Sequence, residues 1–254
     1  MAVTLDLEKV NKELRGRTAE EILRWAAATF GDRLALQSSM QKTAGVLMHM
    51  ISRIAPQTEI IFVDTGVHFP ETLDTRDEFI SRYGLKIRSC APRVSFDAQH
   101  EQFGRYLHEH DDARDGSRPG YLECCRLRKE VPFLDAVKGR FDAVVSGLTR
   151  AEGGARRHIA LVSWDARFEG YKIHPLADWT EEQIDDYTRE HDLPVHPLYA
   201  RGYRSIGCWT CTTPVQPGEH PRAGRWRHLR APAGEGEPFQ PRYCGINLED
   251  KQGD

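Results

Sequence analysis

The chain has 254 residues, of which 39% are hydrophobic and 29% are charged. This is enough apolar sequence for one large α/β domain or two small ones. The net charge of −3, from 35 basic and 38 acidic residues, excludes a global field for holding nucleic acid or an anionic membrane, so an anionic ligand requires a local cluster of bases. There is no apolar run of about 18 residues and no signal-peptide pattern, and we expect a cytoplasmic protein.

Helix and strand patterns alternate along the first part of the chain. Thr18 and Glu21 have the spacing of a capping box, which predicts a packing helix. After it, short apolar or β-branched runs predict strands, and longer apolar runs at helical spacing predict helices. In chain order these are a strand at 34–36, a helix at 43–54, a strand within 59–66 and a helix at 70–83.

The alternation continues beyond residue 84. We expect strands at 85–88 and 143–146, a helix from about Cys125 to Lys138, and a last helix that begins at Thr180. Beyond His191 the chain is rich in Pro, Gly and Arg, which predicts an irregular and mobile C-terminal segment.

Strands that alternate with helices predict an α/β fold with a parallel sheet flanked by helices. Ligands of such sheets bind at the carboxyl ends of the strands. Here the loops at Ser38, Asp64 and Gly147 follow three predicted strands, and we expect them to form one site. We divide the chain into an α/β part, residues 1–207, and a C-terminal part, residues 208–254.

The six cysteines suggest metal binding or thiol chemistry, because a cytoplasmic chain of this size is not expected to have a disulfide framework. Cys208 and Cys211 form a CxxC pair, which alone suits zinc or redox chemistry. The adjacent Cys124 and Cys125 are awkward for one tetrahedral ion but can reach two irons of one cubane. Two such pairs favour a [4Fe-4S] cluster, with structural zinc as the alternative. Cys90, at the end of a predicted strand, is interpreted as a buried apolar residue.

Cys244 lies ten residues from the end of the chain, after the irregular segment. A cysteine on a tail can swing in to attack a substrate and out to be reduced, and nearby arginines would favour its thiolate. Taken alone, Cys244 is better interpreted as an incidental tail cysteine.

Several motifs resemble those of the sulfonucleotide reductases, the family that reduces adenylyl sulfate (APS) or phosphoadenylyl sulfate (PAPS). The resemblance runs from about Thr18 to Leu248. The matching segments are CCRLRK at 124–129, GYRSIGCWTC at 202–211, VDTG at 63–66 with FPET at 69–72, PVQPGEHPRAGRW at 214–226 and GLTRAE at 147–152.

The resemblance implies an adenine-nucleotide alpha-hydrolase-like fold of PP-loop type. It implies that Cys244 attacks the sulfur of APS, releases AMP and becomes a cysteine S-sulfonate, from which thioredoxin or a glutaredoxin-like dithiol releases sulfite. The cluster ligands would be Cys124, Cys125, Cys208 and Cys211, with a structural and electrostatic role for the cluster. The implied substrate-binding residues are Ser38, Ser39, Asp64, Thr65, Gly66, Lys129, Gly147, Arg150, Arg156, Arg222 and Arg225. A solvated surface base is the alternative for each cation taken alone.

The sequence departs from the family pattern at three places. The nucleotide loop reads SSMQK at 38–42 where the family often has SGxxD, Thr149 and Gly153 replace an arginine and a serine, and Asn247 replaces a histidine. The four cluster cysteines and the missing positive charge at Thr149 favour APS over PAPS.

Three alternatives stay open at this point. A PAPS or dual-specificity reductase is the nearest. An ATP pyrophosphatase of the PP-loop group needs an SGGxDS loop, which the chain lacks. A non-catalytic iron-sulfur or zinc-stabilised module would not explain the function of the Asp64 loop or of Cys244. The sequence is compatible with a homo-oligomer and does not define one.

Overall fold

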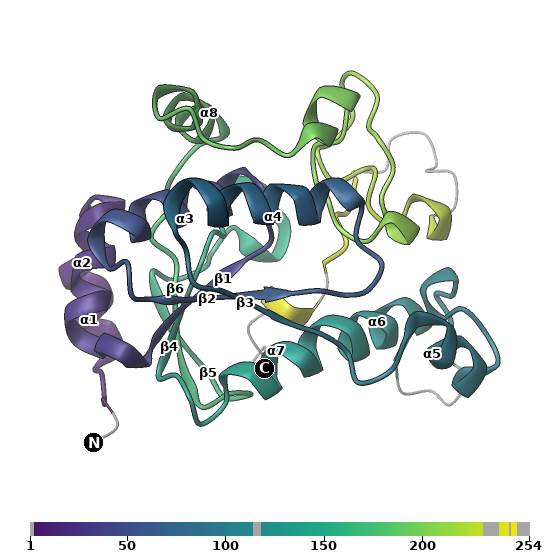
Figure 1. The fold of residues 1–254 in the computed structure, drawn as a ribbon, viewed down its shortest axis with the longest axis horizontal. Coiled ribbons are helices and arrows are strands. Elements are labelled where there is room, and N and C mark those ends of the chain that lie inside the picture. Colours follow the sequence, from purple (N-terminus) through teal and green to yellow (C-terminus); the bar gives the residue numbers. More distant parts are fainter. Residues whose placement is uncertain (1–2, 114–117, 231–238, 244, 248–254) are drawn as a thin grey trace.

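The structure is a computed structural model that describes residues 3–113, 118–230, 239–243 and 245–247. Six strands form one sheet in the order β3-β2-β1-β4-β6-β5 (Figure 1). The first five strands in this order run parallel, and β5 pairs antiparallel with β6. The parallel α/β sheet predicted from the sequence is therefore confirmed. The strands are β1 (Leu34–Ser38), β2 (Glu59–Val63), β3 (Ile87–Cys90), β4 (Ala143–Ser146), β5 (Val162–Asp165) and β6 (Gly170–Ile173).

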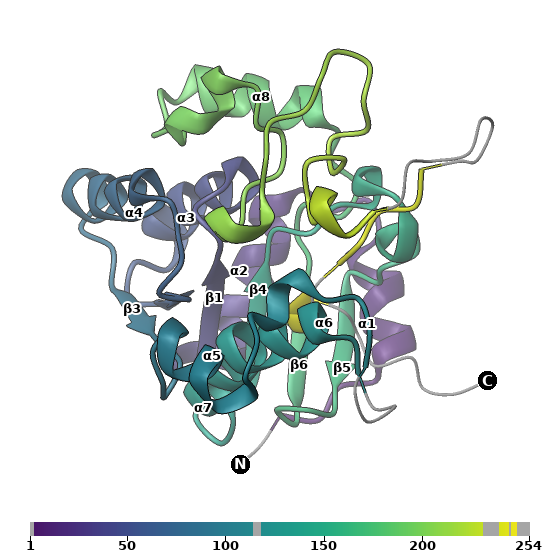
Figure 2. The same ribbon diagram turned by 90° about the vertical axis from the view of Figure 1, so that its right-hand side faces the viewer.

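Helices cover both faces of this sheet (Figures 1 and 2). Alternate residues of a strand point to opposite faces. Leu34 and Leu36 of β1 accordingly belong to the core that packs against α1 to α3, while Ala35 between them packs with Phe133 of α7. The helices are α1 (Leu7–Leu14), α2 (Ala19–Phe30), α3 (Lys42–Ile54), α4 (Pro70–Tyr83), α5 (Phe96–Phe103), α6 (Gly120–Cys125), α7 (Val131–Val137) and α8 (Glu181–Glu190).

Local signals explain where several helices begin. Thr18 and Glu21 form the predicted capping box at α2, and Thr180 forms one at α8. Pro70 opens α4, which ends at Gly84 in the left-handed conformation. The sequence analysis did not predict α1, α5, β5 or β6.

The helix expected from about Cys125 begins earlier, at Gly120, and is not regular. The α6 helix is followed by a π-helical turn, η3 (Arg126–Glu130), and then by α7. A side chain at Gly120 would lie 2.7 Å from the carbonyl oxygen of Leu107, so glycine permits this close start. π-Turns inside helices are frequent at functional sites, and this one follows the adjacent cysteines directly.

The C-terminal part packs against the α/β part. Between residues 208 and 230 it has only short 3-10 turns, which confirms the irregular segment that the composition predicted. Isolated bridges join His68 to Cys208 and Thr212 to Arg225. Tyr243 and Ile246 are buried, so these two tail residues are docked, and the expected mobility of the tail stays a prediction.

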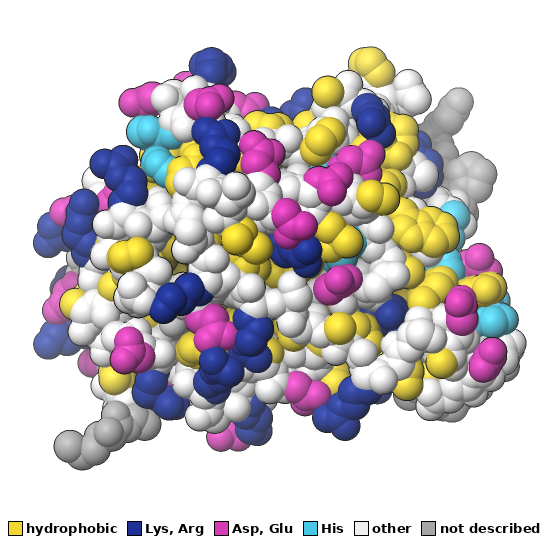
Figure 3. Space-filling model, in the orientation of Figure 1, with side chains coloured by type: hydrophobic (Ala, Val, Ile, Leu, Met, Phe, Trp, Pro, Cys, Tyr) yellow, Lys and Arg dark blue, Asp and Glu magenta, His cyan; other side chains and the backbone are white. Residues whose placement is uncertain are grey.

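Basic and acidic side chains are interspersed on the face that Figure 3 shows, in line with the small net charge. Within the ranges that the structure describes, no helix is both long enough and apolar enough to cross a membrane.

Candidate functional site

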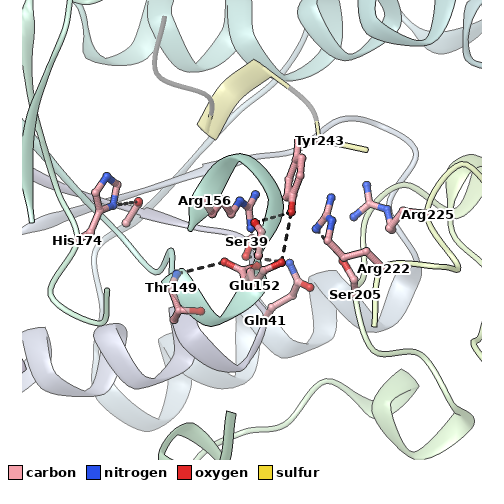
Figure 4. Close-up of polar contacts among 12 residues, drawn as sticks. Ser39, Gln41, Thr149, Glu152, Arg156, His174, Ser205, Arg222, Arg225 and Tyr243 are labelled. Atoms are coloured by element: carbon pink, nitrogen blue, oxygen red, sulfur yellow. Dashed lines mark hydrogen bonds and ion pairs between the residues drawn. The ribbon is translucent and has the colours of Figure 1, made fainter. Parts of the chain in front are cut away.

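A cavity of about 130 Å³ lies where three parallel strands end. The cavity is lined by residues at or just beyond the end of each strand: Ser38 and Ser39 for β1, Val63 and Thr65 for β2, and Ser146 and Gly147 for β4. The convergence of the three predicted loops is thus observed. Several side chains that line this cavity are drawn in Figure 4.

The β1 loop turns sharply before α3. Met40 has a positive φ of 56°, and its backbone N–H donates to the hydroxyl of Ser38 over 3.2 Å. The Gln41 carbonyl oxygen, Oε1, accepts a hydrogen bond of 2.9 Å from the backbone N–H of Ile206, which fixes the loop to the segment before the CxxC pair. Thr43, in the first turn of α3, also lines the cavity. The helix therefore presents its N-terminal end, which favours an anion.

The loops after β2 and β4 are held by backbone geometry. The Asp64 carboxylate accepts from the backbone N–H of Gly66 over 2.9 Å, and Gly66 has a φ of 71°. Asp64 and Gly66 do not line the cavity, so the structure gives them a role in shaping the loop that carries Thr65. A side chain at Gly147 would lie 2.8 Å from the Thr43 hydroxyl, so glycine allows the two loops to touch.

Four basic side chains line the cavity: Lys129, Arg156, Arg222 and Arg225. Arg156 and Arg225 are only 7% and 5% exposed. Arg156 pairs with Glu152 through one terminal nitrogen, yet the Nε atoms of Arg156 and Arg225 are buried with no hydrogen-bond partner among the described residues. The four basic side chains that line the cavity favour an anionic ligand.

Arg150 does not join this group. Its guanidinium donates to the carbonyl oxygen of Ile159, over 2.8 Å from Nη2, and pairs with the carboxylate of Asp178. Apart from Arg150, Asp64 and Gly66, all the predicted substrate-binding residues of the α/β part line the cavity. Position 244, the predicted nucleophile, lies outside the described residues.

The sequence analysis missed several residues of the cavity wall, among them Gln41, Thr43, His68 and Glu152. His68 stacks on Phe62 with 5.2 Å between ring centroids. Burial lowers the pKa of His68 to about 4, so the imidazole is neutral at pH 7. Its place two residues after VDTG in the sequence was the available signal.

A second cavity of about 180 Å³ lies beside the first. The two share four lining residues: Gln41, Thr43, Glu152 and Arg222. A ligand larger than the first cavity therefore has space to extend past Glu152.

The four predicted cluster ligands, Cys124, Cys125, Cys208 and Cys211, line one further small cavity. Each is at most 8% exposed, and aromatic side chains from Tyr121 and Trp226 complete the wall. Burial raises the pKa of the Cys124 and Cys211 thiols. Within the described ranges no three His, Cys, Asp or Glu side chains are grouped tightly enough for a single metal ion.

Lys129 and Arg225 line both the anion cavity and the cysteine cavity. Cys208 also touches the loop after β2, where its Sγ lies 3.5 Å from the Thr65 hydroxyl. The two sites therefore share walls and positive charge. Cys90 lies apart from both; it is partly buried, and this burial raises the pKa of its thiol to about 11.

Fold and site together define an α/β protein of the PP-loop class, with an anion cavity at the strand ends and a cysteine cavity beside it. The sequence profile of the phosphoadenosine phosphosulfate reductase domain matches residues 33–214. The chain belongs to this family.

Its relatives cover nearly the whole chain. A Streptomyces coelicolor protein named adenosine 5'-phosphosulfate reductase is 39% identical over 86% of this chain and 88% of its own. One of the same name from Mycolicibacterium smegmatis is 40% identical over 87% and 89%. Among solved structures, the phosphoadenylyl-sulfate reductase of Candida auris superimposes with a TM-score of 0.70 at 26% identity, covering 84% of this chain and 100% of that one. The FMN adenylyltransferase of Candida glabrata shares the fold, with a TM-score of 0.54 at 17% identity over 96% of this chain and 80% of that one.

Proposed function

We propose that the protein reduces APS to sulfite and AMP in assimilatory sulfate reduction, with a dithiol as reductant. The observation that carries the proposal is the cavity at the strand ends, which Lys129, Arg156, Arg222 and Arg225 line together with the N-terminal end of α3. The names of the relatives, at 35–40% identity, support APS as the substrate.

The chemistry proceeds by transfer of a sulfo group. The Cys244 thiolate attacks the sulfur of APS, an S–S bond forms, and the bond from sulfur to the bridging oxygen breaks, so that AMP leaves with the electron pair. A thiolate of the reductant then attacks Cys244 Sγ, sulfite leaves with the S–S electron pair, and the second thiol of the reductant resolves the mixed disulfide. Two electrons pass from the dithiol to the sulfur, and Cys244 returns as a thiolate.

The residues of the cavity offset the electrostatic cost of this attack. A thiolate and a sulfonate anion repel each other, and this repulsion is strong in a site with little water. Lys129, Arg156, Arg222 and Arg225 supply positive charge around the cavity, and the end of α3 adds its N–H groups.

We propose a [4Fe-4S] cluster held by Cys124, Cys125, Cys208 and Cys211. Four buried thiols around one cavity, from two separate segments, fit such a cluster by their chemistry. When bound, the cluster would supply structural support and electrostatic influence rather than electron transfer. Lys129 and Arg225, which line both cavities, would carry that influence to the substrate anion.

The two parts of the chain have different proposed roles. We propose that residues 1–207 hold the nucleotide and the first cysteine pair, and that residues 208–254 bring the second pair and the nucleophile. Thioredoxin or a glutaredoxin-like protein would be the reductant. A cytoplasmic location suits free thiols and a dithiol donor.

The first test measures sulfite and AMP produced from APS and from PAPS, with protein purified without oxygen and thioredoxin as reductant. We expect turnover of APS that is lost in Cys244→Ser and retained in Cys90→Ser, the matched control outside both cavities. Faster turnover of PAPS would support the PAPS reductase instead, and turnover of neither nucleotide by iron-containing protein would reject the proposed reaction.

The two arginines of the GLTRAE segment and its continuation allow a second test. We expect Arg156→Met to raise the KM for APS by about tenfold to a hundredfold, the loss of one charge-assisted hydrogen bond. Arg150→Met should have a much smaller effect, because its guanidinium is engaged by Asp178 and Ile159 outside the cavity. Steady-state kinetics of both variants decide the matter, and an equal KM increase in the two would contradict this assignment.

A further inference from the structure

Tyr243, which directly precedes the predicted nucleophile, is buried against the anion cavity (Figure 4). Its hydroxyl lies 2.9 Å from the carbonyl oxygen of Gly153 and 3.3 Å from that of Glu152, so it donates to the loop after β4. A side chain at Gly154 would lie 2.7 Å from this hydroxyl, so the glycine leaves room for the phenol.

The Tyr243 ring also contacts two cations of the cavity. The guanidinium carbons of Arg156 and Arg222 lie 4.8 and 4.5 Å from its centroid. Contacts between a ring and a guanidinium group involve the π-face of the ring, and they leave the positive charge of the arginine in place. Tyr243 therefore adds no carboxylate to the cavity, where Glu152 already pairs with Arg156.

The chain on the far side of position 244 is held as well. The carbonyl oxygen of Gly245 accepts from Arg167 over 2.6 Å, and that of Ile246 accepts from Lys172 over 2.9 Å. A Cβ at Gly245 would lie 2.3 Å from the Glu130 carboxylate, so a side chain there would have to displace Glu130. Both neighbours of position 244 are therefore fixed, by independent sets of contacts.

We propose that Tyr243 is a positioning residue, which uses two arginines of the anion cavity to seat the segment that carries the nucleophile. This rests on the proposed function for the identity of the nucleophile and the anion. Docking of the segment and binding of the anion then involve the same guanidinium groups, so each should favour the other through ordering of Arg156 and Arg222.

The test measures exposure of Cys244 without any turnover. The full-length protein is treated with iodoacetamide, with and without AMP, and alkylation is followed by mass spectrometry of the tryptic peptide from Tyr243 to Lys251. We expect Tyr243→Leu to raise the alkylation rate about tenfold, the change that two weak cation–π contacts can produce. Tyr243→Phe, which keeps the ring and loses the hydroxyl, should change it less.

Phe239→Leu is the matched control. Phe239 belongs to the same part of the chain, and the guanidinium carbon of Arg230 lies 4.2 Å from the centroid of its ring. Neither Phe239 nor Arg230 lines the anion cavity. We expect Cys244 to be alkylated in Phe239→Leu at the same rate as in the wild type. Thermal unfolding of each variant verifies that it is folded. In single turnover with saturating APS, Tyr243→Leu should lower the rate of S-sulfonate formation about tenfold, and it should also weaken APS binding, because docking and anion binding favour each other.

An alkylation rate in Tyr243→Leu equal to that of the wild type would overturn the proposal, as would an unchanged rate of S-sulfonate formation. If the wild-type protein does not turn over APS but Tyr243→Leu still exposes Cys244, the proposed reaction fails and the positioning role stands.

Discussion

Cys124→Ser protein, purified without oxygen, is expected to lose its iron and its APS turnover together, the turnover by at least about a hundredfold. Cys124 is buried in the cavity that also contains the other three cysteines, so its replacement leaves three thiols for a group that needs four. Lys129 and Arg225 line both this cavity and the anion cavity. Loss of a cysteine ligand should therefore also affect substrate binding in the anion cavity.

Iron and acid-labile sulfide analysis, beside the APS assay, checks this prediction. Cys90→Ser is the control and should keep both iron and activity, because Cys90 lies in β3 away from the cysteine cavity. Full activity in an iron-free Cys124→Ser protein would refute the role of the cluster. Zinc in place of iron in the wild-type protein would establish the structural zinc alternative.

Asp165→Asn should lower the free energy of unfolding by about 3 kcal/mol, the usual cost of removing one partner from a buried ion pair. The Asp165 carboxylate is fully buried between Arg167, at 2.6 Å, and Lys172, at 3.2 Å. These two cations in turn hold the carbonyl oxygens of Gly245 and Ile246. Loss of the carboxylate therefore weakens both the β5–β6 hairpin and the docked tail.

Urea unfolding gives the comparison. Asp186→Asn is the control, because Asp186 pairs with Arg189 on an exposed face of α8 and should contribute less than about 1 kcal/mol. A free energy of unfolding for Asp165→Asn equal to that of the control would show that the buried pair does not support the hairpin.

The same carboxylate should make stability depend on pH. Burial alone would raise the pKa of Asp165, but the hydrogen bond from Arg167 and the charges of Lys172 and Arg167 outweigh it and hold the pKa below its usual 3.8. A depressed pKa gives stability that is complete above the unfolded-state value of about 3.9 and disappears as the pH falls through the folded-state pKa. Wild-type stability should therefore fall more steeply than that of Asp165→Asn below about pH 4.

The local pattern of the sequence predicted the frame of the molecule. The apolar run of β2 and the capping box at Thr18 act through neighbours in the chain, and both features are present in the structure. The order of strands and helices was enough to place Ser38, Thr65 and Gly147 at one edge of a sheet, because parallel strands end on the same side.

Other features depended on residues far apart in the sequence. Lys172 belongs to a strand that the sequence analysis missed, since a buried lysine is understandable only with Asp165 and the tail carbonyl beside it. The π-turn after Cys125 likewise follows from packing and not from helix periodicity.

The sequence by itself determined the fold class, the three converging loops and the two cysteine pairs, because spacing along the chain encodes them. Only the tertiary structure separated Arg156, which lines the cavity, from Arg150, which pairs with Asp178, although both follow the same strand. Likewise, only the tertiary structure showed that the Tyr243 ring contacts Arg156 and Arg222. The physical reason is that the location of a long basic side chain is decided by the partners that folding brings within its reach.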